Sequence, residues 1–318
     1  MKGPLMWWEE GKRPPLWLRG LSKLYGGISE RVSRRVQPIG APCPVISLGS
    51  LLMGGSGKTP MTMVLARFFQ DRGYAPIILT RGYGGTCKTP TFVTPHHRAI
   101  DVGEEALLLA RIAPTVVSPR RADALSILAL CSKSILLLDD GHQHRSLLKD
   151  LCFLVLNPMQ RWGNGHVFPA GPLREPLSKG LLRADGVFYI DDYFESLPKG
   201  IPAFKVNASF SCALEPGQDV IAFSGLGYPQ RFHATLTGPL ALFPKAFITF
   251  PDHVHYRPQD EVRLLAKSQA CKLPLVTTEK DWVKLSPSMQ HACYVVHQSM
   301  TLEDPERFSQ FIAGTISL

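Results

Sequence analysis

A glycine-rich segment between a predicted strand and a predicted helix constrains this chain most. Residues 49–60 read Gly-Ser-Leu-Leu-Met-Gly-Gly-Ser-Gly-Lys-Thr-Pro, and they lie between an apolar run at 43–48 and a helix-like segment at 61–70. A strand, a glycine-rich loop, Lys-Thr and a helix form the arrangement that binds nucleotide phosphates through backbone N–H groups. The order therefore predicts a phosphate-binding loop (P-loop) in an α/β fold, and a protein that uses ATP or GTP.

The residue types in this loop suit phosphate and magnesium. Glycines let the backbone approach an anion without Cβ clashes, a lysine reaches the β- and γ-phosphates, and a threonine hydroxyl can ligate Mg²⁺. We predict these nucleotide-binding residues: Gly54, Gly55, Ser56, Gly57, Lys58 and Thr59. A common form of the motif has a further glycine where this chain has Leu52. An ordinary glycine-rich turn is the alternative, and the flanking strand and helix argue against it.

Apolar runs continue to alternate with helical segments after this loop. The predicted strands lie at 76–80, 134–138, 151–156 and 186–190, and the predicted helices at 103–112 and 121–131. Continuous apolar strands separated by helices are typical of a parallel sheet covered by helices on both faces. We therefore predict a P-loop core domain over residues 39–212.

A second alternation follows a turn-rich stretch at 191–218. Its predicted strands lie at 220–223, 246–250 and 273–277, and its predicted helices begin near 229 and cover 258–271 and 305–316. We predict a smaller second α/β domain over residues 213–318.

Composition and charge exclude some classes of protein. Of 318 residues, 45% are apolar and 19% charged, which is typical of a globular protein and excludes a disordered one. The net charge is +9, and residues 1–40 contribute eight Lys/Arg and three Glu of the total. This concentration favours an anionic membrane surface or an anionic ligand over a nucleic acid. Seven single cysteines without a CxxC pair indicate reduced thiols in a cytosolic compartment, and no structural zinc site is expected.

Residues 16–36 have the pattern of an amphipathic helix in a predicted N-terminal segment, residues 1–38. Apolar residues fall near one side of this helix: Trp17, Leu18, Leu21, Leu24, Tyr25, Ile28 and Val32. Lysines and arginines surround them, as in helices that lie in a membrane interface. A helix packed on the protein's own core is the alternative. Gly26-Gly27 in the middle of the segment makes a helix less favourable in either interpretation. We find no run of about 18 apolar residues and no signal-peptide pattern, so no transmembrane helix is predicted.

Two aspartates follow the predicted strand at 134–138. A strand-end aspartate in P-loop enzymes holds Mg²⁺, and parallel strands bring their carboxyl ends to one edge. We therefore expect Asp139 and Asp140 to meet Lys58 and Thr59, although an aspartate can also cap a helix.

Further polar residues follow other predicted strands. His253 follows the strand at 246–250 and is a candidate general base or positioning residue, although a lone histidine is more often structural. His142 and His144 could suggest a metal, but they have no third ligand nearby. We prefer polar contacts to substrate or nucleotide for this segment, and a purely structural turn is nearly as good an interpretation. The predicted substrate-contacting residues are Arg81, Tyr83, Arg121, Gln143, His144, Arg174 and Glu175.

Together, these segments resemble the tetraacyldisaccharide 4′-kinase family, the lipid A 4′-kinases of Gram-negative bacteria. The resemblance covers residues from about 43 to 285, and the order and spacing of its motifs make it far more specific than a P-loop alone. The matching motifs lie at 54–60, 81–85, 103–105, 139–144, 163–165, 169–175, 250–253 and 278–281.

The resemblance implies an enzyme that uses ATP and Mg²⁺ to phosphorylate the 4′-hydroxyl of an acylated glucosamine disaccharide 1-phosphate, giving lipid IVA. It also implies two α/β lobes with the site between them, and an N-terminal helix on the cytoplasmic face of the bacterial inner membrane. We expect no nucleic-acid partner and a monomer.

In the family, an Asp-Glu pair follows the glycine equivalent to Gly103, and its aspartate works with the histidine of Phe-Pro-Asp-His. This chain has Glu104-Glu105 there, and the extra methylene of Glu104 changes its reach toward His253. We expect catalysis to depend on Lys58, Glu104, Asp139, Asp140 and His253. The expected Mg²⁺ ligands are Thr59, Glu105, Asp139 and Asp140, and Arg81, Arg121 and Arg174 are candidates to neutralise phosphate charge. The alternatives are a nucleotide-hydrolysing switch or metal-delivery chaperone, and a non-enzymatic scaffold at a membrane surface.

Overall fold

The computed structural model describes residues 5–9, 11–156, 162–190 and 200–316. Within these ranges the strands form one twelve-stranded mixed sheet. Its strands, in spatial order, are β10 (Phe243–Thr249), β9 (Asp219–Ser224), β11 (Leu275–Thr278), β12 (Cys293–Leu302), β8 (Ala203–Ser211), β7 (Gly186–Ile190), β6 (Leu151–Leu156), β1 (Val45–Gly49), β5 (Ser134–Leu138), β2 (Ala75–Thr80), β4 (Thr115–Val117) and β3 (Thr91–Phe92).

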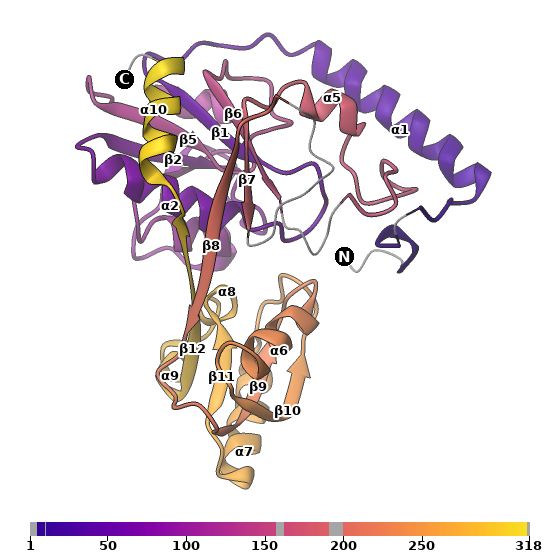
Figure 1. Ribbon diagram of the computed structural model, residues 1–318. Helices are drawn as coiled ribbons and strands as arrows, with labels where there is room; N and C mark the ends of the chain where they lie inside the picture. The colour runs from indigo at the N-terminus through magenta and orange to yellow at the C-terminus, as the bar shows by residue number, and fades with distance from the viewer. Residues whose placement is uncertain (1–4, 10, 157–161, 191–199, 317–318) are drawn as a thin grey trace.

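The sheet extends through two lobes that the long strands β8 and β12 connect (Figure 1). The larger lobe contains β1 to β7, and the smaller lobe contains β9 to β11. Most neighbouring strands are parallel, as predicted, but β12 pairs with β8 and β3 with β4 in antiparallel fashion. The α-helices are α1 (Leu16–Arg34), α2 (Lys58–Gln70), α3 (Ala99–Val102), α4 (Glu104–Leu109), α5 (Leu177–Leu181), α6 (Pro229–Thr237), α7 (Pro258–Cys271), α8 (Glu279–Trp282), α9 (Pro287–Ala292) and α10 (Pro305–Thr315). Short 3₁₀ helices cover Leu5–Trp7 (η1) and Arg121–Ser126 (η2).

The central strands are buried on both faces, which explains their uninterrupted apolar sequence. Every residue of β1 and of β5 is buried. Because successive side chains of a strand point to opposite faces, Ile46 packs with α2 and α10, whereas its neighbour Val45 packs in a second cluster with Ala124 of η2. The strands thus form the middle layer of the larger lobe.

Two predictions about local structure were wrong. Residues 121–131 were expected to form a helix, but only the 3₁₀ helix η2 forms, and residues 127–131 are irregular. Here the buried Arg121 side chain donates to the backbone carbonyls that follow β5, so tertiary contacts determine the local conformation. The stretch 191–218 was expected to be turn-rich, but it contains β8; residues 191–199 lie outside the described part. Along β8, more buried residues alternate with less buried ones, so the strand lacks the continuous apolar run of the central strands.

Helix α10 packs into the core of the larger lobe although it ends the chain. Phe308 is fully buried, and its ring lies 5.0 Å from those of Phe68 and Phe204 and 5.4 Å from that of Phe188, measured between centroids. This cluster contributes to the stability of the fold through buried apolar area and edge-to-face ring contacts.

Replacing Phe308 by alanine is expected to lower the free energy of unfolding by about 3–5 kcal/mol, because it leaves a cavity in this cluster. Denaturant unfolding followed by circular dichroism measures the change. Leu182→Ala is the control, since Leu182 is 86% exposed and its loss should change the free energy by less than about 0.5 kcal/mol. Equal stability of the two variants would contradict the packing of α10.

Helix α1 lies along the outside of the larger lobe (Figure 1). It contacts the rest of the protein through a hydrogen bond from the Ser22 hydroxyl to the Val167 carbonyl (2.6 Å), through an ion pair between Glu30 and Lys179, and through the ring of Tyr25. Its large apolar side chains remain exposed, among them Leu16, Trp17, Leu21, Leu24 and Ile28. No helix in the described ranges combines the length and the apolar character that a membrane span requires.

Candidate active site

The loop between β1 and α2 lies at the edge formed by the carboxyl ends of the parallel strands β1, β5 and β2. Gly54 and Gly57 have φ angles of 108° and 89°, in the left-handed region that favours glycine. A Cβ on Gly54 or Gly55 would have no heavy atom within 4 Å, so the loop is open at these positions. The Ser56 hydroxyl is buried and has no hydrogen-bond partner among the described residues. An open loop with an unpaired buried hydroxyl fits an anion bound at the start of α2.

The two strand-end aspartates contact the helix α2 that follows this loop, and the expected approach of Asp140 to Lys58 is found. Asp139 is buried and accepts a hydrogen bond from the hydroxyl of Thr62 in α2 (3.0 Å). Asp140 lies 3.7 Å from the ammonium group of Lys58 and accepts two hydrogen bonds from Arg174, at 2.8 and 3.0 Å. Segments far apart in sequence therefore bring one lysine, one arginine and two carboxylates together.

Burial and nearby charges give these carboxyl groups different pKa values. Burial and the carboxylates of Glu105 and Asp140 raise the pKa of Asp139 to about 7. Burial also acts to raise the pKa of Asp140, but the positive charges of Lys58, Arg174 and Arg121 outweigh it and lower that pKa to about 2. A buried carboxyl group with a raised pKa beside other carboxylates is an environment that a cation would relieve.

The donors at this edge fit Mg²⁺ with part of its water shell retained. Asp139, Asp140 and Glu105 would supply carboxylates, and Thr59 at the start of α2 would supply a hydroxyl. Among the described residues, no three carboxylate, imidazole or thiol side chains form a ready-made cage. Mg²⁺ does not need one, because it commonly uses one or two carboxylates, water and substrate phosphate.

The predicted arginines have different surroundings. Arg121 is buried, and its guanidinium donates to the carbonyls of Asp139 (2.8 Å) and Asp140 (3.1 Å), so it holds the turn after β5. Arg174 binds Asp140 and also donates to the Leu52 carbonyl of the loop (3.2 Å). Arg81 is exposed at the end of β2.

Two of the remaining predicted substrate-contacting residues, Gln143 and Glu175, belong to one side-chain network. Gln143 donates to the Ser50 carbonyl (3.1 Å) and to Glu175 (3.0 Å), and Glu175 accepts two hydrogen bonds from Arg183, at 2.6 and 2.7 Å. His144 contacts the Ser146 hydroxyl, and burial with the charges of Arg121 and Lys149 lowers the pKa of His144 to about 4.

Sequence reasoning missed Lys149 and Arg183. Lys149 donates to the carbonyls of Gly141 (2.8 Å) and His142 (3.0 Å) and thus supports the turn that carries Asp140. The only sequence signal for these residues was their charge, which is common on protein surfaces.

His253 of the smaller lobe faces residues of the larger lobe. Its Nδ1 lies 3.0 Å from Oε1 of Glu104, the first residue of α4. The ring of Tyr83 packs edge-on against the imidazole, with centroids 4.8 Å apart. The longer Glu104 side chain therefore reaches the histidine.

Two lysines of the smaller lobe complete this contact and were not predicted. Lys280 lies 2.8 Å from Glu105, and Lys284 lies 3.0 Å from the second oxygen of Glu104. Burial acts to raise the pKa of Glu104, but the hydrogen bond from His253 and the charges of Lys280 and Lys284 lower it to about 2. Glu104 is therefore ionised at neutral pH.

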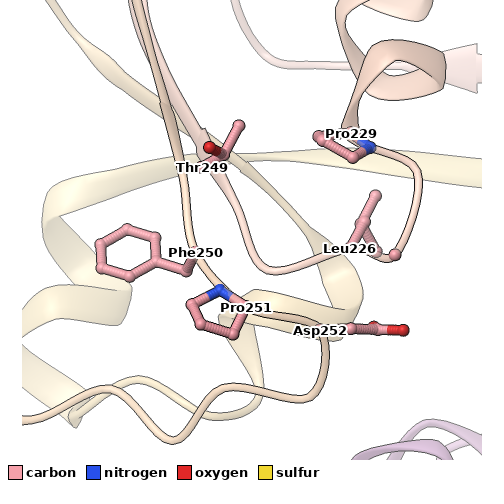
Figure 2. A pocket seen from close by; sticks show the side chains of 7 residues that line it. Leu226, Pro229, Thr249, Phe250, Pro251 and Asp252 are labelled. Atoms are coloured by element: carbon pink, nitrogen blue, oxygen red, sulfur yellow. The ribbon is translucent and has the colours of Figure 1, made fainter. Parts of the chain in front are cut away.

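A pocket of about 510 Å³ lies next to His253, at the carboxyl ends of β9 and β10. Figure 2 shows the two loop segments that enclose it, with Phe250, Pro251 and Asp252 on one and Leu226 and Pro229 on the other. Asp252 connects this pocket to the lobe contact, since its carboxylate lies 3.8 Å from Nε2 of His253. The pocket thus has apolar side chains beside the carboxylate of Asp252.

The fold and this arrangement of residues are typical of an α/β kinase that uses a nucleotide. A family model described as tetraacyldisaccharide-1-P 4′-kinase matches residues 15–317. A tetraacyldisaccharide 4′-kinase of Bradyrhizobium sp. (strain ORS 278) is 38% identical over 302 residues, which cover 90% of this chain and 88% of the relative. That of Gluconacetobacter diazotrophicus is 37% identical and covers 96% and 95%.

A solved structure agrees with these sequence comparisons. The crystal structure of LpxK from Aquifex aeolicus in complex with ATP has a TM-score of 0.75 and 30% sequence identity, over 95% of this chain and 99% of the other. The chain belongs to the tetraacyldisaccharide-1-P 4′-kinase family.

Proposed function

We propose that this protein transfers the γ-phosphate of ATP to the 4′-hydroxyl of a tetraacylated glucosamine disaccharide 1-phosphate, giving lipid IVA in lipid A biosynthesis. Membership of the family supports the reaction and the substrate. The observation in the structure that carries the proposal is the 3.0 Å contact between Glu104 and His253. It couples a carboxylate of the larger lobe to an imidazole of the smaller lobe, in the geometry of an oriented general base.

The residues of the larger lobe would hold ATP. Backbone N–H groups of the loop, together with Lys58 and Ser56, bind the β- and γ-phosphates, and Thr59, Asp139, Asp140 and Glu105 hold Mg²⁺ directly or through water. Mg²⁺ held by these residues would supply positive charge that neutralises the phosphates. Lys58 and Arg174 both contact Asp140, and this shared contact supports the proposal that the two cations neutralise charge on the phosphates.

The residues around His253 would act on the sugar. With Nδ1 bonded to Glu104, Nε2 of His253 can accept the proton of the 4′-hydroxyl as that oxygen attacks phosphorus. Tyr83 limits the movement of the imidazole, and Arg81 is exposed at the same edge to meet anionic groups of the substrate. Arg121 contributes indirectly, since its donors hold the turn of Asp139 and Asp140. Gln143, His144 and Glu175 are proposed to contact substrate or nucleotide from the same edge.

The domain division remains a proposal, with an N-terminal segment at 1–38, a P-loop domain at 39–212 and a smaller domain at 213–318. Separate apolar clusters in the two lobes support it. Helix α10 packs with the larger lobe, and β12 leads the chain from the smaller lobe back to the larger one.

We further propose that α1 docks the protein, as a monomer, on the cytoplasmic face of the inner membrane. Its exposed apolar side chains and the eight lysines and arginines of residues 1–40 suit an anionic lipid surface.

Replacing Leu21 and Leu24 together by aspartate is expected to weaken binding to anionic phospholipid vesicles by about 100-fold or more, since each leucine contributes at least about 1.5 kcal/mol of apolar burial. Vesicle cosedimentation measures the change. The control exchanges two exposed apolar residues outside α1, Leu148 and Val262, for aspartate. Unchanged vesicle binding by the α1 variant would argue that another surface meets the membrane.

The reaction is tested with γ-labelled ATP and a tetraacyl disaccharide 1-phosphate in mixed micelles, with a lipid-free control. Labelled bisphosphorylated lipid is the expected product. Release of labelled phosphate without lipid, and no labelled lipid, would instead favour a nucleotide-hydrolysing switch.

A further inference from the structure

A buried lysine lies behind the Glu104–His253 contact and has no part in the mechanism described so far. The side chain of Lys284 is 2% exposed, and its ammonium lies 3.0 Å from Oε2 of Glu104 and 3.0 Å from Oδ1 of Asp281. Both carboxylates are buried as well, at 7% and 0% exposure. A cation that is withdrawn from water loses its hydration, and here two ion pairs offset this cost, although neither has hydrogen-bond geometry.

Asp281 is a rigid anchor for this lysine. Its carboxylate accepts hydrogen bonds from the Gly225 backbone (3.0 Å), the Tyr256 hydroxyl (2.9 Å) and the Thr278 hydroxyl (2.8 Å). These donors come from three different segments of the smaller lobe. The position of the Lys284 ammonium is therefore set by the smaller lobe, and Glu104 meets it from the larger lobe.

The two oxygens of Glu104 have separate partners. Oε1 contacts His253 and is 3.5 Å from Lys280, whereas Oε2 contacts Lys284. Lys280 has its shorter contact with Glu105, at 2.8 Å. Of these cations, Lys284 is the one whose contact is with Oε2 of Glu104, the oxygen that does not contact His253.

We propose that Lys284, anchored by Asp281, is a positioning residue that orients the Glu104 carboxylate toward His253 when the lobes are together. The inference rests on the proposed kinase function. A glutamate has one more rotatable bond than an aspartate and loses more rotamer freedom when it is held in one geometry. A fixed cation on its second oxygen restricts that freedom, so the chain can use Glu104 as the partner of the histidine.

The main test is kinetic and compares Lys284→Met with the wild-type enzyme. Methionine keeps the apolar length of the side chain and removes the charge. We expect kcat for lipid phosphorylation to fall by about 10- to 100-fold, as is typical when a residue that orients a site residue is lost. The KM for ATP should stay within about 2-fold, because the proposed ATP site belongs to the larger lobe.

A double-mutant cycle separates positioning from a general effect. If Lys284 acts through Glu104, adding Lys284→Met to Glu104→Gln should lower kcat by less than about 3-fold, because the interaction is already lost. Lys245→Met, which removes an exposed lysine of the smaller lobe paired with Asp219, is the matched control and should keep wild-type kinetics. Independent, multiplicative effects of the two substitutions on kcat would overturn the inference, as would an unchanged kcat in Lys284→Met.

A second variant keeps the test decisive if Lys284→Met does not fold. Lys284→Met leaves the Asp281 charge buried without its cation, so Lys284→Met/Asp281→Asn, which removes both charges, is assayed in parallel and should show the same loss of kcat. If neither variant folds by circular dichroism, Lys284 is a structural residue and the inference is wrong. If instead the wild-type enzyme phosphorylates no lipid, the proposed function fails, and this outcome is distinct from the others.

Discussion

Lys58→Ala should reduce phosphate transfer to the lipid by about 10²- to 10³-fold or to below detection. Lys58 is the first residue of α2, is largely buried and lies 3.7 Å from Asp140. Its charge is therefore held at the place where the phosphates of ATP are proposed to bind. A charged donor aimed at developing negative charge in a site that excludes water contributes several kcal/mol to the transition state. Its removal also leaves Asp140 with fewer counter-charges.

The measurement is single-turnover transfer from γ-labelled ATP at saturating lipid. Lys245→Met is again a suitable control, since Lys245 is an exposed lysine of the other lobe. Full activity of Lys58→Ala would remove the phosphate-binding interpretation of residues 54–59, whatever the resemblance of the loop to a P-loop.

His253→Ala is expected to lower kcat by about 10²- to 10⁴-fold, the range for loss of a general base. The affinity for ATP should change little, because His253 belongs to the smaller lobe and contacts Glu104 and Tyr83 rather than the loop after β1. Loss of turnover with intact nucleotide binding is the result that separates a role in activating the sugar from a role in holding ATP.

Equilibrium binding of a fluorescent ATP analogue and steady-state kinetics together give this comparison. His291→Ala provides a control at an exposed histidine of the same lobe, whose ring contacts only the Pro287 carbonyl of its own helix among the contacts described. Turnover of His253→Ala close to the wild-type rate would exclude the general-base role. A large loss of ATP affinity would instead place His253 in the nucleotide site.

Much of the larger lobe could be predicted because its signals are local. The runs that form β1, β5 and β6 are continuously apolar since both of their faces are covered, and the glycine-rich loop follows one of them directly. Strands β8 and β12 were not predicted. Strand β8 alternates apolar and polar residues from Phe204 on, and the short apolar run that begins β12 is followed by the polar residues His297, Gln298 and Ser299, so both strands depend on pairing with each other. Their partners are about ninety residues away in the chain, so no short window of sequence contains the signal.

The sequence by itself determined the α/β class, the family and the types of residue available for phosphate, magnesium and proton transfer, because each of these depends on short motifs in a fixed order. Only the tertiary structure decided which of them meet. Glu104, His253 and Lys284 come from different segments of two lobes, and their contacts at 3.0 Å follow from how α4, the loop after β10 and the turn after α8 pack. Such contacts depend on how both lobes pack as a whole. A lysine or glutamate that this packing buries looks the same in the sequence as one that lies on the surface.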